Sequence, residues 1–271
     1  MSIGGAPVLQ RGSGIPVVMV HGNGVDHRCL LPLDPAFAQP GVFRRVYVDL
    51  PGFGQTPALT DRGGLPQLAD WLEGTVREVV GTEPFAIVGQ SMGGLLATEI
   101  ADRLPGQVLG VGLCAPVVYP QAERRTLPER CILHSEPRLL ASLSAADAEN
   151  YAEMSVVQSE ANYQRFERFV LPGIRVANVR AMAKLAREYT LPRLPVEGAG
   201  QWPHGVIITG RQDQVVGYQD QRRLRDRFAT VEHVELDRAG HNVHIDRPRR
   251  VLAAMRNFAA AVAAEAKETG Q

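Results

Sequence analysis

Residues 85–100 place a Gly-x-Ser-x-Gly motif between an apolar run and a helical pattern. Residues 85–88 are typical of a buried strand, the motif occupies residues 89–93, and apolar residues at helical spacing follow it. Strand, tight turn and helix form the context of a nucleophile elbow, in which the turn holds the serine in a strained conformation with its hydroxyl projecting from the sheet. The flanking glycines leave room where a Cβ would collide with a neighbouring strand or helix. The pattern predicts that Ser91 is a nucleophile, whereas the alternative is a glycine-rich turn with an incidental serine.

Two partners for this serine follow in a fixed order along the chain. Asp213 comes shortly after the apolar run 205–210, and His241 comes shortly after the alternating run 231–236. The order serine, acid, histidine is the one expected when a catalytic triad is built on an open α/β sheet. In that arrangement His241 takes the serine proton and later returns it, and Asp213 holds the imidazole in the useful tautomer. Each partner alone could be a turn or loop residue, but together they favour a catalytic role.

An oxyanion hole is predicted at the end of the apolar strand 15–20, where His21-Gly22-Asn23-Gly24 follows. The expected donors are the backbone N–H groups of Asn23 and Met92, because N–H groups beside the nucleophile can stabilise the developing negative charge. We expect His21 itself to be structural and to bond the loop backbone.

The quoted motifs resemble those of the α/β-hydrolase superfamily, in its cofactor-free serine branch with a helical lid. The resemblance implies a mostly parallel sheet of the eight-stranded type and argues against the branches with an aspartate nucleophile, since position 91 is serine. It leaves open esterases, lactonases, thioesterases, carbon–carbon bond hydrolases, amidases, perhydrolases and some lyases. The matching segments are His21-Gly22-Asn23-Gly24, Asp49-Leu50-Pro51-Gly52-Phe53-Gly54, Gly89-Gln90-Ser91-Met92-Gly93-Gly94, Gly210-Arg211-Gln212-Asp213 and Gly240-His241.

Strands and helices are expected to alternate, which predicts an α/β fold with helices on both faces of a mostly parallel sheet. The ligand should then bind beyond the carboxyl ends of the strands. We divide the chain into a first core part (residues 1–116), a helical lid insertion (117–194) and a second core part (195–271). The predicted strands are 7–10, 16–20, 45–50, 85–88, 108–113, 205–210 and 231–236, and the predicted core helices are 65–80 and 249–264.

The insertion shows no good strand and three apolar faces at helical spacing, the first beginning at Ser144. The three faces comprise Tyr151, Met154 and Val157; Tyr163, Phe166 and Val170; and Val179, Met182, Leu185 and Ala186. The residues that we expect to bind substrate are Phe53, Tyr151, Met154, Phe166 and Val243, although about half of the lid residues could instead hold the lid helices together. Four arginines lie early in the insertion, and one of them could bind an acidic substrate or a thioester carrier. Such charges are more often simply solvated, so we assign them no role. The four are Arg124, Arg125, Arg130 and Arg138.

Composition fits one soluble globular enzyme of 271 residues. The 29 basic and 29 acidic residues balance, which argues against nucleic acid as the main partner. No secretory signal, membrane span, metal-ligand spacing or dinucleotide loop is expected. Three widely spaced cysteines fit the cytoplasm better than a disulfide framework, and we take Cys114 as a core residue. A small molecule is the expected partner, no cofactor or metal is expected, and a homodimer is compatible with the sequence.

The preferred hypothesis is a serine hydrolase that acts on small to medium carboxylic esters or lactones through an acyl-enzyme. Carbon–carbon bond hydrolysis or lyase chemistry on the same triad is the alternative among enzymes. A ligand-binding protein on a retained hydrolase scaffold is the alternative of a different class, since fold alone does not define function.

Overall fold

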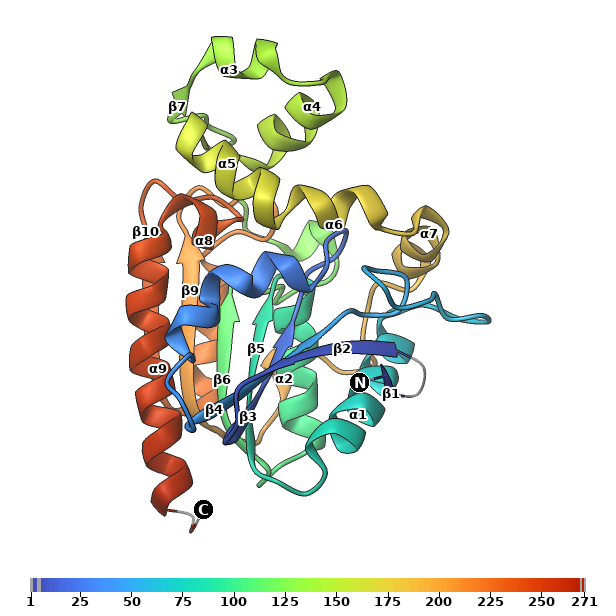
Figure 1. The fold of residues 1–271 in the computed structure, drawn as a ribbon, viewed down its shortest axis with the longest axis vertical. Coiled ribbons are helices and arrows are strands. Elements are labelled where there is room, and N and C mark those ends of the chain that lie inside the picture. Colours follow the sequence, from blue (N-terminus) through green and yellow to red (C-terminus); the bar gives the residue numbers. More distant parts are fainter. Residues whose placement is uncertain (1, 4–5, 269, 271) are drawn as a thin grey trace.

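The computed structural model describes residues 2–3, 6–268 and 270 and contains an eight-stranded sheet (Figure 1). The strand order is β1-β2-β4-β3-β5-β6-β9-β10. The β1–β2 and β2–β4 pairs are antiparallel and the remaining pairs are parallel. The strands are β1 (Ser2–Ile3), β2 (Ala6–Arg11), β3 (Ile15–Val20), β4 (Phe43–Val48), β5 (Phe85–Gln90), β6 (Val108–Cys114), β9 (Trp202–Gly210) and β10 (Phe228–Leu236).

The central strands are buried on both faces. Because successive side chains of a strand point to opposite sides of the sheet, each strand contributes to the core on either side. In β3, Val18 and Val20 join one hydrophobic core, while Val17 and Met19 join the other. These strands therefore read in the sequence as continuous apolar runs, which is typical of parallel sheets covered by helices.

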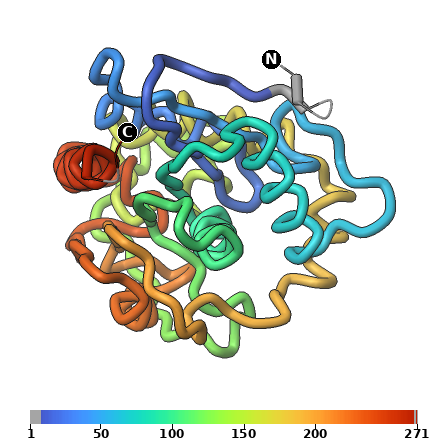
Figure 2. The backbone as a smooth tube through the Cα atoms, turned by 90° about the horizontal axis from the view of Figure 1, so that it is seen from below, coloured from blue at the N-terminus to red at the C-terminus, as the bar shows by residue number. Residues whose placement is uncertain are grey.

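Helices cover the two faces in separate groups. Helices α1 (Leu65–Val80) and α2 (Met92–Arg103) and the 3₁₀ segment η4 (Asp220–Arg227) contribute to the first core. The long helix α9 (Pro248–Glu268) and the 3₁₀ segment η1 (His27–Ala36) contribute to the second. Seen from below, α9 in red lies well apart from α1 and α2 (Figure 2). The predicted α/β fold class is confirmed.

The predicted strands and helices of the core are present in the structure, with small shifts at their ends. Helix α1 has the predicted bounds, and Pro66 stands in its first turn, where a missing N–H is tolerated. Several core elements were not predicted, among them β1, which is only two residues long, η1, which contains Pro32 and Pro35, η4 and the short helix α8 (Val243–Asp246). The predicted core parts include residues 1, 4, 5, 269 and 271, which lie outside the described residues. The expectation of no secretory signal rests partly on them.

The segment between β6 and β9 contains a helical insertion, which we define as residues 117–194. Its first predicted helix begins at Ser144, whose side chain accepts a hydrogen bond from the backbone N–H of Asp147. Tyr163 and Phe166 of the second predicted face are buried, whereas Val179 of the third is 78% exposed and α6 (Leu171–Val176) was not predicted. Figure 1 shows α5 and α6 above the carboxyl ends of the sheet strands. The helices of the insertion are α3 (Pro137–Ser142), α4 (Ala145–Met154), α5 (Glu160–Phe169), α6 (Leu171–Val176) and α7 (Val179–Arg187), preceded by the short 3₁₀ segment η2 (Ala122–Arg124).

Two predictions for the insertion were wrong. It contains a parallel pair of strands, β7 (His134–Ser135) and β8 (Val157–Gln158). Val157 therefore lies in a strand and does not continue the face of α4. A strand of two residues is too short to show the alternation by which strands are recognised in a sequence.

Within the described residues, no helix combines the length and the hydrophobicity needed to cross a bilayer.

Helix α9 approaches the sheet closely where β6 carries two glycines. A Cβ at Gly110 would lie 2.8 Å from the Phe258 ring, and a Cβ at Gly112 would lie 3.2 Å from it. The Phe258 ring is buried and meets Phe37 of the segment after η1 edge to face, with 6.3 Å between ring centroids. Phe258 therefore joins the sheet to both elements that cover this face.

Replacing Phe258 with alanine should lower the free energy of unfolding by about 3–5 kcal/mol, because it removes a buried ring and leaves a cavity. Urea unfolding at equilibrium measures this change. The exposed Arg256 lies on the same helix, and Arg256→Ala should change the free energy by less than about 0.5 kcal/mol. Equal effects of the two substitutions would contradict this account of the packing.

Candidate active site

The turn between β5 and α2 holds Ser91 in a backbone conformation that residues other than glycine rarely adopt. Ser91 has φ 55° and ψ −121°, and it stands immediately before the first residue of α2. Its backbone N–H donates to the Cys114 carbonyl at 3.0 Å, and its carbonyl accepts from Val117 at 3.0 Å. A Cβ at Gly93 would run into the backbone carbonyl oxygens of Val20 and His21. The fold therefore requires glycine beside the serine, and strain of this kind is typical of functional sites.

Asp213 and His241 meet beyond the carboxyl ends of β9 and β10. The Asp213 Oδ2 lies 2.9 Å from the His241 Nδ1. The other oxygen, Oδ1, accepts backbone N–H groups of Val215 at 2.8 Å and Val216 at 3.0 Å. Asp213 is fully buried and His241 is 6% exposed. Because a carboxylate accepts, the His241 Nδ1 donates, which leaves Nε2 as the atom that can take a proton.

The side chain of Gln90 faces the same Nε2 atom. Its Nε2 lies 3.4 Å from the His241 Nε2, so the amide donates to the free lone pair of the imidazole. No hydrogen bond joins the Ser91 Oγ to His241 in the described part of the chain. The Gln90 oxygen fills the space beside Gly22, where a Cβ would collide with it. Gln90 therefore lies between the histidine and the loop that follows β3.

That loop is fixed from beneath by His21. The His21 Nε2 accepts the Leu50 backbone N–H at 2.9 Å, and Nδ1 lies 2.7 Å from the Gly22 carbonyl. Burial lowers the pKa of His21 below its ordinary value, which agrees with a neutral ring that donates on one side and accepts on the other. His21 thus bonds the loop backbone, as expected from the sequence.

The role of the Asn23 and Met92 N–H groups as oxyanion donors stays a prediction, and the structure shows where the two residues lie. Asn23 lines the pocket that contains Ser91, and no acceptor for its backbone N–H is found among the described residues. Met92 is the first residue of α2, so its N–H has no partner inside the helix. The side chain of Met92 is buried in the core beneath.

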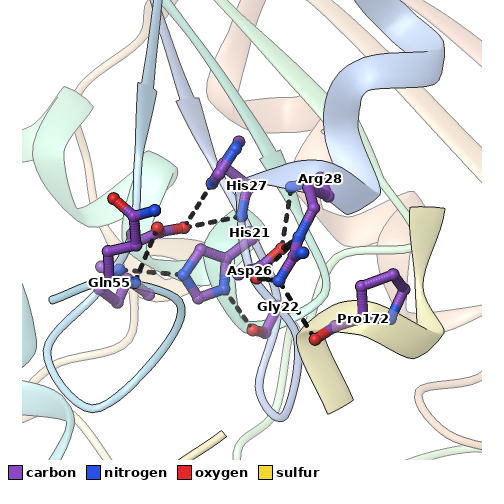
Figure 3. A network of polar contacts seen from close by, with 9 residues as sticks. His21, Gly22, Asp26, His27, Arg28, Gln55 and Pro172 are labelled. Atoms are coloured by element: carbon purple, nitrogen blue, oxygen red, sulfur yellow. Dashed lines mark hydrogen bonds and ion pairs between the residues drawn. The ribbon is translucent and has the colours of Figure 1, made fainter. Parts of the chain in front are cut away.

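A polar network ties the loop after β3 to its neighbours (Figure 3). Asp49 accepts the His27 Nδ1 at 2.8 Å and the Gln55 backbone N–H at 3.1 Å. Burial alone would raise the pKa of Asp49, but the hydrogen bonds from His27 outweigh this and hold the pKa below its ordinary value. Arg28 pairs with Asp26 and donates to the Pro172 carbonyl of α6 at 3.1 Å. The network therefore joins the loop to the insertion.

Three potential metal ligands of this network, on Asp26, His27 and Asp49, lie within 4.8 Å of one another. These three residues lie close together because they bond to Arg28, to Gln55 and, in the case of His27 and Asp49, to each other. These bonds link neighbouring loops, which is a structural role. The absence of a bound metal stays a prediction from the sequence.

A pocket of about 550 Å³ opens above Ser91 and His241. The core contributes Asn23 and Gln90 to its wall, and the insertion contributes side chains from several places along its length. These include Arg125 after η2, Met154 of α4, Ile174 of α6 and Met182 of α7. The serine and the histidine thus face a chamber that is built jointly by the core and the insertion.

The five residues predicted to bind substrate lie in different places, and only Met154 lines this pocket. Phe53 is buried in the core, where its ring meets His21 edge to face with 5.4 Å between centroids. Tyr151 and Phe166 are fully buried in a small core of the insertion, 5.3 Å apart between centroids. Val243 is buried beneath the histidine loop. Nearness to a motif in the sequence does not determine on which side of a loop a side chain points.

Most of the lining residues were not predicted, among them Gln90, Val170, Ile174 and Tyr189. The position of Gln90 beside the serine was the only available signal for it. Cys29 also lines the pocket, but burial raises its pKa well above the ordinary value, and burial raises the pKa of Cys114 to about 12. Both thiols therefore stay protonated and are poor nucleophiles.

The model of the alpha/beta hydrolase family matches residues 17–254 of the chain. The chain belongs to this family.

Relatives and solved structures agree with this assignment. A pimeloyl-[acyl-carrier protein] methyl ester esterase of Legionella pneumophila is 36% identical over 99 residues, which cover 36% of this chain and 37% of the relative. The match thus spans little more than a third of that protein. The crystal structure of an alpha/beta superfamily hydrolase from Oenococcus oeni has a TM-score of 0.85 and 26% identity, covering 94% of this chain and 95% of that one. An esterase from Exiguobacterium antarcticum, at 16% identity and a TM-score of 0.69 over 93% and 94% of the two chains, shares the fold.

Asp246 connects the histidine loop to the insertion. Its Oδ2 accepts the Gly240 backbone N–H at 2.8 Å, and its Oδ1 accepts the Asn162 side-chain amide of α5 at 2.9 Å. Removal from water raises the pKa of Asp246 to about 7, and the nearby charge of Asp213 acts in the same direction.

This shift predicts a pH-dependent contribution to stability. Because the pKa is raised in the folded protein, the contribution is fully present below the ordinary pKa of 3.8 and is lost as the pH rises through about 7. The free energy of unfolding of the wild type, relative to Asp246→Asn, should therefore fall between pH of about 4.5 and about 7.5. Urea titrations across this range measure it. The exposed Asp61, changed to asparagine, is the matched control, and parallel pH curves for the wild type and Asp246→Asn would contradict the assignment.

Proposed function

We propose that this chain is a serine hydrolase that cleaves small to medium carboxylic esters or lactones. One observation carries the proposal: a histidine bonded to a buried carboxylate shares a pocket with a serine held at positive φ. The names of the relatives support the choice of ester substrates, and 550 Å³ is within the ordinary range of small-molecule sites.

In the proposed reaction, the Ser91 Oγ attacks the carbonyl carbon of the ester while the His241 Nε2 takes its proton. The Gln90 amide must release the Nε2 lone pair when this proton arrives. Asp213 stabilises the imidazolium through Nδ1 and keeps the ring oriented. The carbonyl oxygen becomes an oxyanion, which accepts hydrogen bonds from the N–H groups of Asn23 and Met92.

The tetrahedral intermediate collapses when its bond to the alcohol oxygen breaks, and His241 returns the proton to the departing alcohol. Water then attacks the acyl-enzyme, with His241 again as the base, and the acid is released from Ser91. Every proton transfer in acylation and in deacylation uses the His241 Nε2, so one correctly oriented histidine is sufficient.

We propose that the insertion of residues 117–194 acts as a lid. It supplies much of the pocket wall, and Arg28 and Asp246 link it to the two loops that carry the oxyanion donor and the histidine. A lid of this kind excludes water from the reacting atoms and selects substrates by shape. The cytoplasmic location, the absence of a cofactor and the compatibility with a homodimer stay predictions from the sequence.

Replacing Ser91 with alanine should lower kcat for p-nitrophenyl butyrate by about 10³-fold or more, because the attacking oxygen is removed while the fold is retained. Release of p-nitrophenolate measures the rate. Ser135→Ala, which changes a serine outside the pocket, is the matched control and should keep full activity. Full activity in Ser91→Ala would contradict the nucleophile assignment. Lack of turnover by a folded wild type would favour carbon–carbon chemistry or a binding protein.

Met154 and Phe166 should differ in what their truncation changes. Met154→Ala enlarges the pocket, so it should alter the relative kcat/KM for short and long acyl chains with little effect on stability. Phe166→Ala removes a fully buried ring and should lower the free energy of unfolding by about 3–5 kcal/mol. A series of p-nitrophenyl esters and urea unfolding measure the two effects. An unchanged chain-length profile in Met154→Ala would contradict the position of this residue in the pocket.

A further inference from the structure

Arg125 is a cation in the wall of the pocket that contains Ser91 and His241. It is partly buried, and it reaches the pocket from the start of the insertion. A guanidinium stays charged at any pH at which the protein is folded, so this charge contributes permanently to the potential inside the chamber.

Three backbone carbonyls fix the guanidinium in place. Its Nε donates to Tyr119 at 2.8 Å, its Nη2 to Pro120 at 2.7 Å and its Nη1 to Val215 at 3.0 Å. An arginine has five N–H groups, so two of them remain, one on each terminal nitrogen. Because the carbonyls are neutral, they orient the side chain without neutralising its charge.

No ion pair joins Arg125 to a carboxylate of the residues that the structure describes. The neighbouring Arg124 differs in this respect, since it pairs with Glu197 at 3.1 Å and stacks over the Tyr119 ring. Glu153, the one acidic side chain that lines the pocket among the described residues, is exposed and is not paired with Arg125. A partly buried charge without a counter-charge is costly in a protein, and a charged ligand would offset that cost.

Tyr189 adds a second donor beside this cation. It lines the same pocket, and its hydroxyl has no hydrogen-bond partner among the described residues. Burial raises the pKa of Tyr189 to about 12, and the positive charge of Arg125 opposes that rise. A protonated phenol and the two remaining guanidinium N–H groups of Arg125 are donors that a carboxylate accepts well.

We infer that Arg125, with Tyr189, binds an ionised carboxylate carried by the substrate, so that the preferred esters contain a free acid group as well as the scissile bond. This inference rests on the proposed ester hydrolysis and adds the substrate class. A carboxylate would form a two-pronged pair with the guanidinium, and the pair would hold the ester carbonyl at a fixed distance in the pocket.

The test compares matched substrates that differ only in charge. One series consists of monomethyl esters of dicarboxylic acids with four to eight carbons, each against its ω-carboxamide, which has the same shape without the charge. A second series carries the carboxylate or the carboxamide on the alcohol side of a butyrate ester. Release of the alcohol gives kcat and KM for each substrate.

The wild type should prefer the carboxylate over the amide by at least about tenfold in kcat/KM for at least one chain length. The preference should shrink as ionic strength rises, because salt screens the attraction. In Arg125→Gln it should fall to within about twofold, through a higher KM for the carboxylate and an unchanged KM for the amide. Arg124→Gln, at the paired neighbour, is the matched control and should keep the preference.

Several outcomes would overturn the inference. A wild type that cleaves the carboxylate and the carboxamide of each pair equally contradicts it. An Arg125→Gln variant that loses activity equally on carboxylates and carboxamides also contradicts it, since that result means that the arginine is purely structural. If Arg125→Gln does not fold, Arg125→Lys is the second variant, because it keeps the positive charge but lacks the two terminal N–H groups of the guanidinium. Its preference for the carboxylate over the carboxamide should be reduced, and an undiminished preference contradicts the two-pronged pair. Failure of the proposed function gives a different result, namely no Ser91-dependent turnover of any member of either series.

Discussion

The strained turn at Ser91 is the constraint on which the rest of the site depends. A positive φ at a residue with a Cβ is unfavourable by roughly 1–3 kcal/mol, and here the surrounding backbone enforces it. The Ser91 N–H donates to the last residue of β6, the Ser91 carbonyl accepts from Val117 just after it, and Gly93 allows α2 to lie against the end of β3. Three adjacent strands must therefore be in register before the serine can face the pocket.

The other groups reach the serine because parallel strands end at the same edge of the sheet. Asp213 follows β9, His241 follows β10 and Asn23 follows β3. None of these loops is held by the reacting groups alone. His21 bonds the loop backbone after β3, two backbone N–H groups orient Asp213, and Asp246 fixes the histidine loop. The site is thus positioned by neutral and charge-assisted hydrogen bonds to the backbone, which bring the groups together before substrate binds.

The sequence was sufficient to predict the fold, and it indicated Ser91, Asp213 and His241, because each of them follows a run that can be recognised as a strand. The structure brings Asp213 and His241 into contact and places His241 in one pocket with Ser91, and the catalytic roles of the three residues stay a proposal. The sequence was insufficient for the pocket. Phe53 lies inside a family motif and Val243 follows one, yet both point into the core, whereas Gln90 and Tyr189 line the chamber without any periodic signal. The direction of a loop side chain depends on the tertiary packing around it. The arginines show the same limit, since only the contacts distinguish the carbonyl-bound Arg125 from the salt-bridged Arg124.

The most direct test of the central claim, that Ser91 is an activated nucleophile, is labelling with a fluorophosphonate followed by peptide mass spectrometry. An activated serine reacts with this reagent, and an ordinary serine hydroxyl does not, because it lacks a base to take its proton. We expect one adduct, on the peptide that contains Ser91, and a strong reduction of its yield in His241→Ala. A folded wild type that stays unlabelled, or an adduct that persists at full yield in Ser91→Ala, would contradict it.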